Sequence, residues 1–170
     1  WVVVYLGNFV GSILTALIMF FTEQYMMGGG SVGLTAINIA NTKANLAFMP
    51  ALALGIMCNA LVCLAVWMCM GARSTTDKIL AIIFPITAFV ACGFEHSVAN
   101  MYYIPGAILA KQWMPPEMWQ TIGKVAADFP NLTIQNFFIA NLLPVTLGNI
   151  IGGAVIIGLT YWWIYLKSGR

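Results

Sequence analysis

The stretch Gly93-Phe94-Glu95-His96-Ser97-Val98-Ala99-Asn100 lies in the middle of an apolar run from Ile79 to Ala110. It places an acid, the only histidine of the chain, a hydroxyl and an amide where a bilayer would have its centre. An ionisable side chain at that depth is costly unless it faces a cavity or a partner. His96 is therefore the first candidate functional residue.

The composition is that of an integral membrane protein. Hydrophobic residues make up 61% of the 170 residues and charged residues only 7%, against about 25% charged in a soluble domain. Four runs are apolar and long enough to cross a bilayer: residues 1–21, 49–70, 79–110 and 136–166. We predict an all-α chain with four spans in one transmembrane domain. Because the sequence starts inside an apolar run without a Met, we expect it to be a fragment.

The third span is too long for one straight helix. A helix over residues 79–110 would measure about 45 Å, well above the apolar thickness of a bilayer, about 30 Å. We predict a break near 93–97, where Gly93 gives backbone freedom and the polar side chains satisfy released amides. The second half-helix would then aim its N-terminus inward, an arrangement that favours an anion.

One short pattern occurs twice. Gly7-Asn8-Phe9-Val10-Gly11 in the first span matches Gly148-Asn149-Ile150-Ile151-Gly152 in the last. Glycines four apart allow close helix packing, which is the simplest interpretation of either copy. Because transporters are often built from inverted repeats, the repetition also predicts that two helices precede Trp1 and that the parent protein has six spans.

His96 and Glu95 receive different interpretations. A histidine has an unperturbed pKa near physiological pH and can exchange a proton or a hydrogen bond with a transported acid. The alternative is a neutral histidine satisfied by helix carbonyls. Adjacent helical residues do not share a face, so Glu95 would point away from whatever His96 faces. We interpret Glu95 as a support for the break.

Three further residues lie near the predicted second span. Lys43, just outside the span, is either an ordinary solvated lysine or a base that concentrates small anions at a pore mouth. Asn59 lies inside the span and needs a partner, either on another helix or in a pore. Val62 lies one turn further on.

The charges favour one orientation of the chain. Arg73, Lys78, Lys167 and Arg170 fall on one side of a four-span arrangement. The positive-inside rule therefore places the 71–78 loop and the C-terminus in the cytoplasm, with loops 22–48 and 110–136 outside. Within the latter loop, a proline pair at 115–116 predicts a short interfacial helix.

Other classes of function find little support. The net charge of +2 without a basic run argues against nucleic acid. The four cysteines lack metal-type spacing, so we expect no metal and no cofactor. A serine enzyme using Ser97 and His96 is disfavoured because the side chains of neighbouring helical residues point in different directions. A haem-bearing electron-transfer subunit is disfavoured because one histidine cannot supply both ligands of a bis-histidine haem. We therefore expect no enzyme, and the remaining alternative class is a structural subunit of a membrane complex.

Segments in all four spans resemble the formate/nitrite transporter family, and within it the formate channels. They are Tyr5–Gly11, Gly55–Met68, Gly71–Ser74, Phe94–Met101 with Ile104-Pro105, and Asn141–Gly153. The resemblance implies an aquaporin-like six-helix protomer with an inverted repeat, of which this chain holds the last four spans. It also implies a homopentamer with a pore in each protomer, in a prokaryotic inner membrane.

The resemblance also implies roles for individual residues. His96 is similar to the pore histidine between two constrictions, Phe89 to an aromatic of the outer one and Val62 to a member of the inner one. Asn59 is similar to the amide near the histidine, and Lys43 to the vestibule lysine. Ser97 and Asn100 complete the expected pore residues, with Glu95 and Gly93 as structural support. Family members can have further histidines near the vestibule lysine, where this chain has Ala44, Asn45 and Leu46. Additional proton exchange at that mouth of the pore is therefore not expected.

The resulting hypothesis is a channel or transporter for small monovalent anions. Formate is the first candidate, and nitrite and hydrosulfide are the alternatives. Lys43 would draw the anion in, and a proton from His96 or from vestibule water would neutralise it. A neutral acid can then cross apolar constrictions that oppose a bare anion.

Overall fold

The computed structural model describes residues 1–167, which form helices joined by short connections, without a strand in that range. Arg170, one of the bases behind the predicted cytoplasmic C-terminus, lies outside the described residues. The chain divides into two compact units. The first comprises Trp1–Ala47 and Ser97–Leu142, and the second comprises Phe48–His96 and the chain from Leu143 onward.

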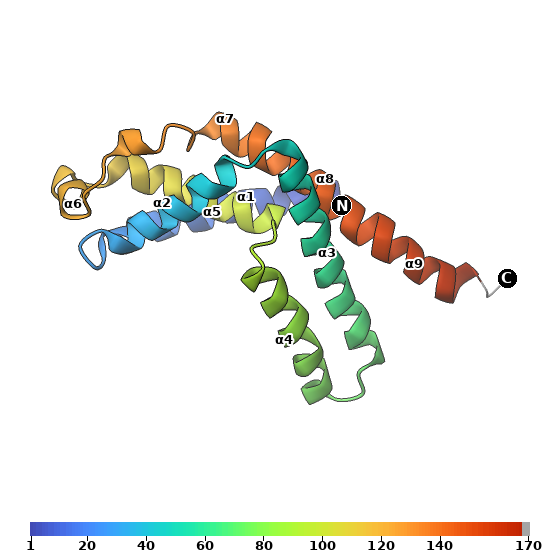
Figure 1. The fold of residues 1–170 in the computed structure, drawn as a ribbon. Helices are drawn as coiled ribbons and strands as arrows, with labels where there is room; N and C mark the ends of the chain where they lie inside the picture. The colour runs from blue at the N-terminus through green and yellow to red at the C-terminus, as the bar shows by residue number, and fades with distance from the viewer. Residues whose placement is uncertain (168–170) are drawn as a thin grey trace. The chain divides into compact units, whose positions relative to one another are not determined.

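The first unit is built around helix α5 (Ser97–Trp113). Helices α1 (Val2–Phe21) and α2 (Ser31–Ala44) both pack against α5 (Figure 1). Its core is a cluster of apolar side chains that includes Ile37, Met101 and Ile104, each 0% exposed. The remaining elements are η1 (Gln24–Met26), α6 (Pro116–Thr121), η2 (Ala126–Asp128), α7 (Ile134–Asn136) and η3 (Phe137–Leu142), the last with π-helical hydrogen bonding.

Helix α2 lies inside the segment that was expected to be an outward loop, residues 22–48. Three consecutive glycines with positive φ, Gly28 to Gly30, precede the helix. Ile37, Ala40 and Ala44 then recur on one side of it and are buried in the core. The helix is amphipathic, with exposed polar residues opposite the buried side. The interfacial helix expected near the proline pair is present as α6.

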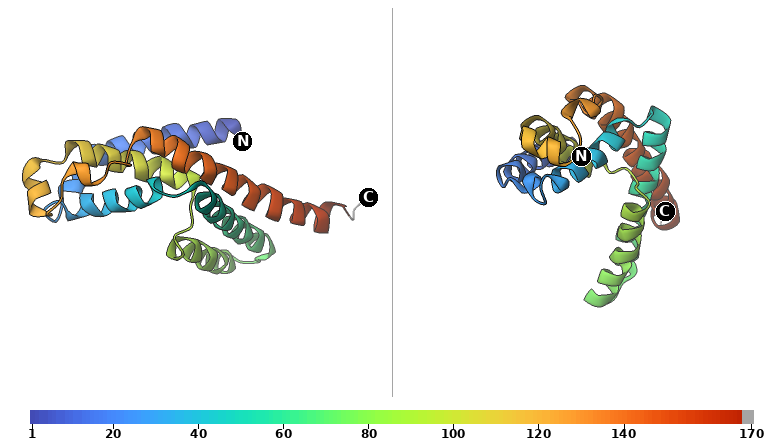
Figure 2. Two further views of the ribbon diagram at one scale, coloured as in Figure 1. Left: turned by 45° about the horizontal axis from the view of Figure 1, so that its top comes forward. Right: turned by 60° about the vertical axis from the view of Figure 1, so that its left-hand side comes forward.

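The second unit holds a helical hairpin and the end of the chain. Helices α3 (Phe48–Gly71) and α4 (Thr75–Ala91) run side by side in every view (Figure 1 and Figure 2). A capping box starts α4, in which Ser74 and Asp77 exchange hydrogen bonds of 3.1 Å between side chain and backbone N–H. The later elements are α8 (Leu143–Ile150), η4 (Ile151–Gly158), α9 (Leu159–Tyr161) and η5 (Trp162–Leu166).

Small residues bring α3 close to the helix formed by α8 and η4. A Cβ on Gly55 would lie 2.8 Å from the Val145 carbonyl oxygen. A Cβ on Gly148 or Gly152 would overlap the carbonyl oxygens of Leu52 or Ile56. Backbone-to-backbone packing of this kind is the usual role of small residues in membrane helices.

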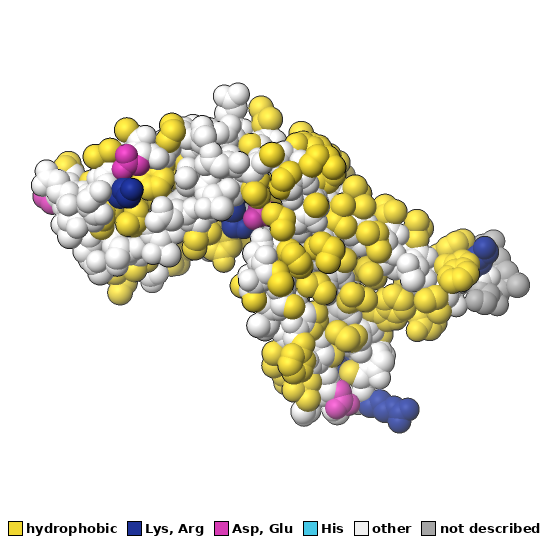
Figure 3. Space-filling model, in the orientation of Figure 1, with side chains coloured by type: hydrophobic (Ala, Val, Ile, Leu, Met, Phe, Trp, Pro, Cys, Tyr) yellow, Lys and Arg dark blue, Asp and Glu magenta, His cyan; other side chains and the backbone are white. Residues whose placement is uncertain are grey.

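Within residues 1–167, three helical runs are long and apolar enough to cross a membrane: Val2–Phe21, Phe48–Gly71 and Ile134–Leu166. The predicted third span is divided into α4 and α5, each of 17 residues or about 25 Å. The residues between them are 92–96, which confirms the predicted break. On the face shown in Figure 3, hydrophobic side chains cover α3, α4 and α9, and charged ones gather at the loop joining α3 to α4.

Candidate functional site

The break begins with a glycine that ends α4. Gly93 has φ +67°, the left-handed conformation that favours glycine. Its N–H donates to the Val90 carbonyl at 3.1 Å, and the Phe94 N–H donates to the Phe89 carbonyl at 3.0 Å. These two hydrogen bonds form a Schellman motif, which satisfies carbonyls that the end of a helix leaves open. Hydrogen bonds between residues close in the sequence therefore end α4 at this point.

The backbone of Glu95 ties the break to its neighbours in the second unit. Its N–H donates to the Leu54 carbonyl in α3 at 3.4 Å, and its carbonyl accepts from Asn149 Nδ2 at 2.9 Å. The same Asn149 amide donates to the Gly55 carbonyl at 2.9 Å. Glu95 is 3% exposed. This geometry favours the interpretation of Glu95 as a support for the break.

Asn59 belongs to the same polar network. Its Nδ2 donates to the Asn149 carbonyl oxygen at 2.6 Å, so the amide predicted to need a partner has a helix-to-helix one. Val62 is half-buried and lies one turn further along α3. Asn149 is the central residue of this network, although sequence reasoning singled it out only as part of a repeated glycine motif.

His96 is the last residue of the break and lies close to Phe89. The two ring centroids are 6.1 Å apart with an angle of 33° between the planes. Both side chains are half-buried. The structure therefore brings together the histidine and the aromatic residue that the sequence predicted for one pore, and their roles in it stay predictions.

Two other candidates in the first unit, Asn100 and Lys43, meet through another asparagine. Asn100 Nδ2 donates to Asn141 Oδ1 at 2.8 Å, and Asn141 Nδ2 donates to the Lys43 carbonyl at 3.1 Å. Both asparagines are 0% exposed. Ser97, 5% exposed, is the first residue of α5. Asn141 was missed by sequence reasoning, although a buried amide within an apolar helix is a signal that could have found it.

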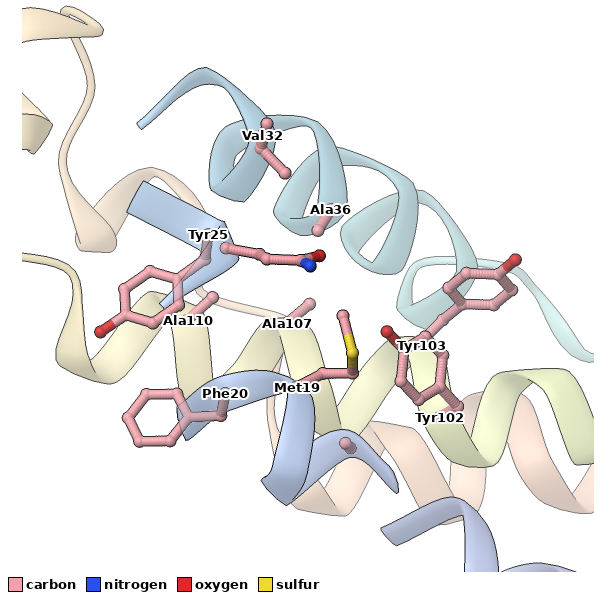
Figure 4. Close-up of a pocket in the computed structure, with 12 residues that line it drawn as sticks. Met19, Phe20, Tyr25, Val32, Ala36, Tyr102, Tyr103, Ala107 and Ala110 are labelled. Atoms are coloured by element: carbon pink, nitrogen blue, oxygen red, sulfur yellow. The ribbon is translucent and has the colours of Figure 1, made fainter. Parts of the chain in front are cut away.

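A pocket in the first unit lies apart from these candidates. The pocket is lined from α1, η1, α2 and α5 by residues that include Met19, Phe20, Tyr25, Val32, Ala36, Tyr102 and Tyr103 (Figure 4). None of the predicted site residues lines it. Its lining is mostly apolar and aromatic, so it has no group suited to exchanging protons with an acid. Within residues 1–167, histidine, cysteine and acidic side chains form no group that could hold a metal.

Within residues 1–167, three apolar helical runs of membrane-spanning length, together with the polar break at His96 between α4 and α5, are typical of a multi-span membrane protein. The family model described as formate/nitrite transporter matches residues 1–163. The chain belongs to the formate/nitrite transporter family. This confirms the resemblance found in the sequence.

Individual relatives agree with this assignment. Formate channel FocA of Escherichia coli K12 is 46% identical over 168 residues, which are 99% of this chain and 59% of FocA. Nitrite transporter NirC of Salmonella typhimurium is 38% identical over 175 residues, which are 98% of this chain and 54% of NirC. A solved pentameric formate channel with formate bound has a TM-score of 0.92 and 50% identity, over 98% of this chain and 66% of that one. The chain thus spans less than two thirds of the length of these relatives.

Proposed function

We propose that the protein is a transmembrane channel or transporter for small monovalent anions, with formate as the main substrate. The observation that carries the proposal is the helix broken at His96. The chain also belongs to a family in which several relatives similar to it are formate channels. Nitrite is the alternative favoured by the likeness to NirC. Hydrosulfide is a third anion of similar size and charge. No catalytic residue is assigned.

The proposed mechanism moves the anion as a neutral acid. Lys43, at the end of α2, attracts the anion electrostatically. His96 then donates a hydrogen bond or a proton to the carboxylate, while vestibule water is the alternative proton source. Phe89 and Val62 form apolar constrictions that oppose a bare anion by several kcal/mol but admit the neutral acid. Without a second histidine beside Lys43, proton exchange is centred on His96.

The remaining polar candidates position the histidine and the substrate. Asn59 acts beside His96, and Ser97 and Asn100 offer a hydroxyl and an amide along the pore. Glu95 and Gly93 hold the break in its shape through the backbone hydrogen bonds described above. Support for the role of Glu95 comes from the burial of its side chain.

The functional form we propose is a homopentamer in a prokaryotic cytoplasmic membrane. The likeness to a pentameric formate channel supports the assembly. Arg73, in the segment that joins α3 to α4, and Lys78, in the first turn of α4, support a cytoplasmic position for that loop and for the C-terminus.

Formate influx into proteoliposomes tests the proposal. The full-length protein is reconstituted, and uptake of labelled formate is compared with that of empty vesicles made from the same lipid. We expect protein-dependent influx that unlabelled nitrite and hydrosulfide inhibit less than unlabelled formate does. Influx no greater than in empty vesicles would exclude a formate channel. Stronger competition by nitrite would identify nitrite as the substrate instead.

A further inference from the structure

A chain of asparagine side chains joins the two segments that are predicted to lie on the outer side of the membrane. Asn131 Nδ2 donates to Asn45 Oδ1, although the two residues are 86 apart in the sequence. Asn45 Nδ2 in turn donates to the carbonyl and to the side-chain oxygen of Asn41, at 2.6 and 3.0 Å. Asn136 Nδ2 donates to the Asn131 carbonyl at 2.8 Å. None of these four residues has a role in the proposed mechanism.

The loop that carries Asn131, residues 125–133, is fixed to the first unit, and we refer to it as the strap. Phe129 and Leu132 are buried in the core, 4% and 2% exposed. The Lys111 ammonium, from α5, donates to the carbonyls of these two residues at 2.6 and 3.3 Å. Hydrogen bonds from a charged donor are stronger than neutral ones. Because these contacts already order the strap, Asn131 loses little conformational entropy when it binds Asn45.

The asparagine chain reaches the last turn of α2, which carries Lys43. The carbonyls at the end of a helix lack partners further along it, and two of them here accept from asparagine amides. Asn45 Nδ2 donates to the Asn41 carbonyl, and Asn141 Nδ2 donates to the Lys43 carbonyl at 3.1 Å. Asn141 is buried, whereas Asn45 and Asn131 are exposed. The last turn of α2 is therefore held by the core and by the strap.

We propose that Asn131 is a positioning residue for Lys43. The ends of helices fray, and the strap opposes fraying of α2 through the hydrogen bond from Asn131 to Asn45. The Lys43 ammonium then keeps one position at the pore mouth. Because the attraction between charges falls with distance, a lysine in a fixed position concentrates anions there better than one whose helix end is frayed. The inference rests on the proposed role of Lys43 in attracting formate.

The concentration dependence of formate influx into proteoliposomes of the full-length protein tests the positioning. Asn131→Ala removes the hydrogen bond to Asn45 at an exposed position. At low salt, we expect it to raise the half-saturating formate concentration by about threefold and to leave the maximal rate unchanged. At 1 M salt the Debye length is only about 3 Å, so we expect the variant and the unaltered protein to have the same half-saturating concentration. Lys43→Gln is expected to show the same dependence on salt.

The matched control is Asn38→Ala, because Asn38 is exposed on α2 and does not belong to the asparagine chain. We expect it to leave the half-saturating concentration unaltered at both salt concentrations. If Asn131→Ala behaves like this control while the unaltered protein transports formate, the positioning role alone is overturned. A shift that persists at high salt, or a change in the maximal rate alone, would overturn it too, because either indicates a purely structural role. Absence of formate influx in the unaltered protein would overturn the proposed function and this inference together.

Discussion

Replacing His96 by phenylalanine is expected to lower formate influx by roughly ten- to a hundredfold. The phenylalanine keeps the ring beside Phe89, whose centroid lies 6.1 Å from that of His96, but removes the hydrogen bond to the acid. A polar group that crosses an apolar region without a partner loses about 1–3 kcal/mol in protein mutational data. Each 1.4 kcal/mol corresponds to about a tenfold change in rate. Influx into proteoliposomes of the full-length variant measures the effect.

The matched control for this substitution is Cys92→Ala. Cys92 is exposed and precedes Gly93 in the same break, so its replacement perturbs the same loop without touching the imidazole. We expect its influx to equal that of the unaltered protein. If His96→Phe elutes as an intact assembly and transports formate at the unaltered rate, His96 has no part in conduction and the alternative of a structural subunit gains support.

Replacing Asn149 by leucine is expected to remove both stability and transport. Leucine has a similar volume but no donor, so the carbonyls of Gly55 and Glu95 each lose a hydrogen bond of 2.9 Å. A buried group left unsatisfied costs about 1–3 kcal/mol. We expect a loss of roughly 2 kcal/mol or more from the two together. Thermal unfolding of the solubilised protein measures the stability, and formate influx measures the function.

Asn38→Leu is the control for this second experiment. Asn38 lies on the exposed side of α2, so the same exchange there removes no buried hydrogen bond. Should Asn149→Leu unfold at the same temperature as Asn38→Leu and conduct normally, the network around Asn149 does not hold the break in place.

The position of the break could be predicted because its causes are local. Gly93 and the polar residues after it appear in the sequence at the point where an apolar run exceeds the thickness of a bilayer. The conformation of Gly93 and the Schellman motif that ends α4 depend on neighbouring residues only. Phe89 and His96 also end up close together because they lie only seven residues apart, on either side of that motif.

The partners of the break could not be predicted because they depend on tertiary contacts. Asn149 is 54 residues from Glu95, and Asn141 is 41 residues from Asn100. Nothing local indicates which carbonyl each amide reaches. Helix α2 was missed for a related reason. Its buried residues are small or apolar and could equally belong to a loop, and only the packing of the helix against α5 shows that they form one buried side.

The number of protons that enter with each formate tests the central claim most directly. Proteoliposomes of the full-length protein are loaded with a pH-sensitive dye, and proton and labelled formate entry are recorded together and corrected for empty vesicles. Neutralisation at the broken helix predicts about one proton for each formate. Formate entry without protons, accompanied by a growing membrane potential, would show that the anion crosses with its charge and would contradict the account.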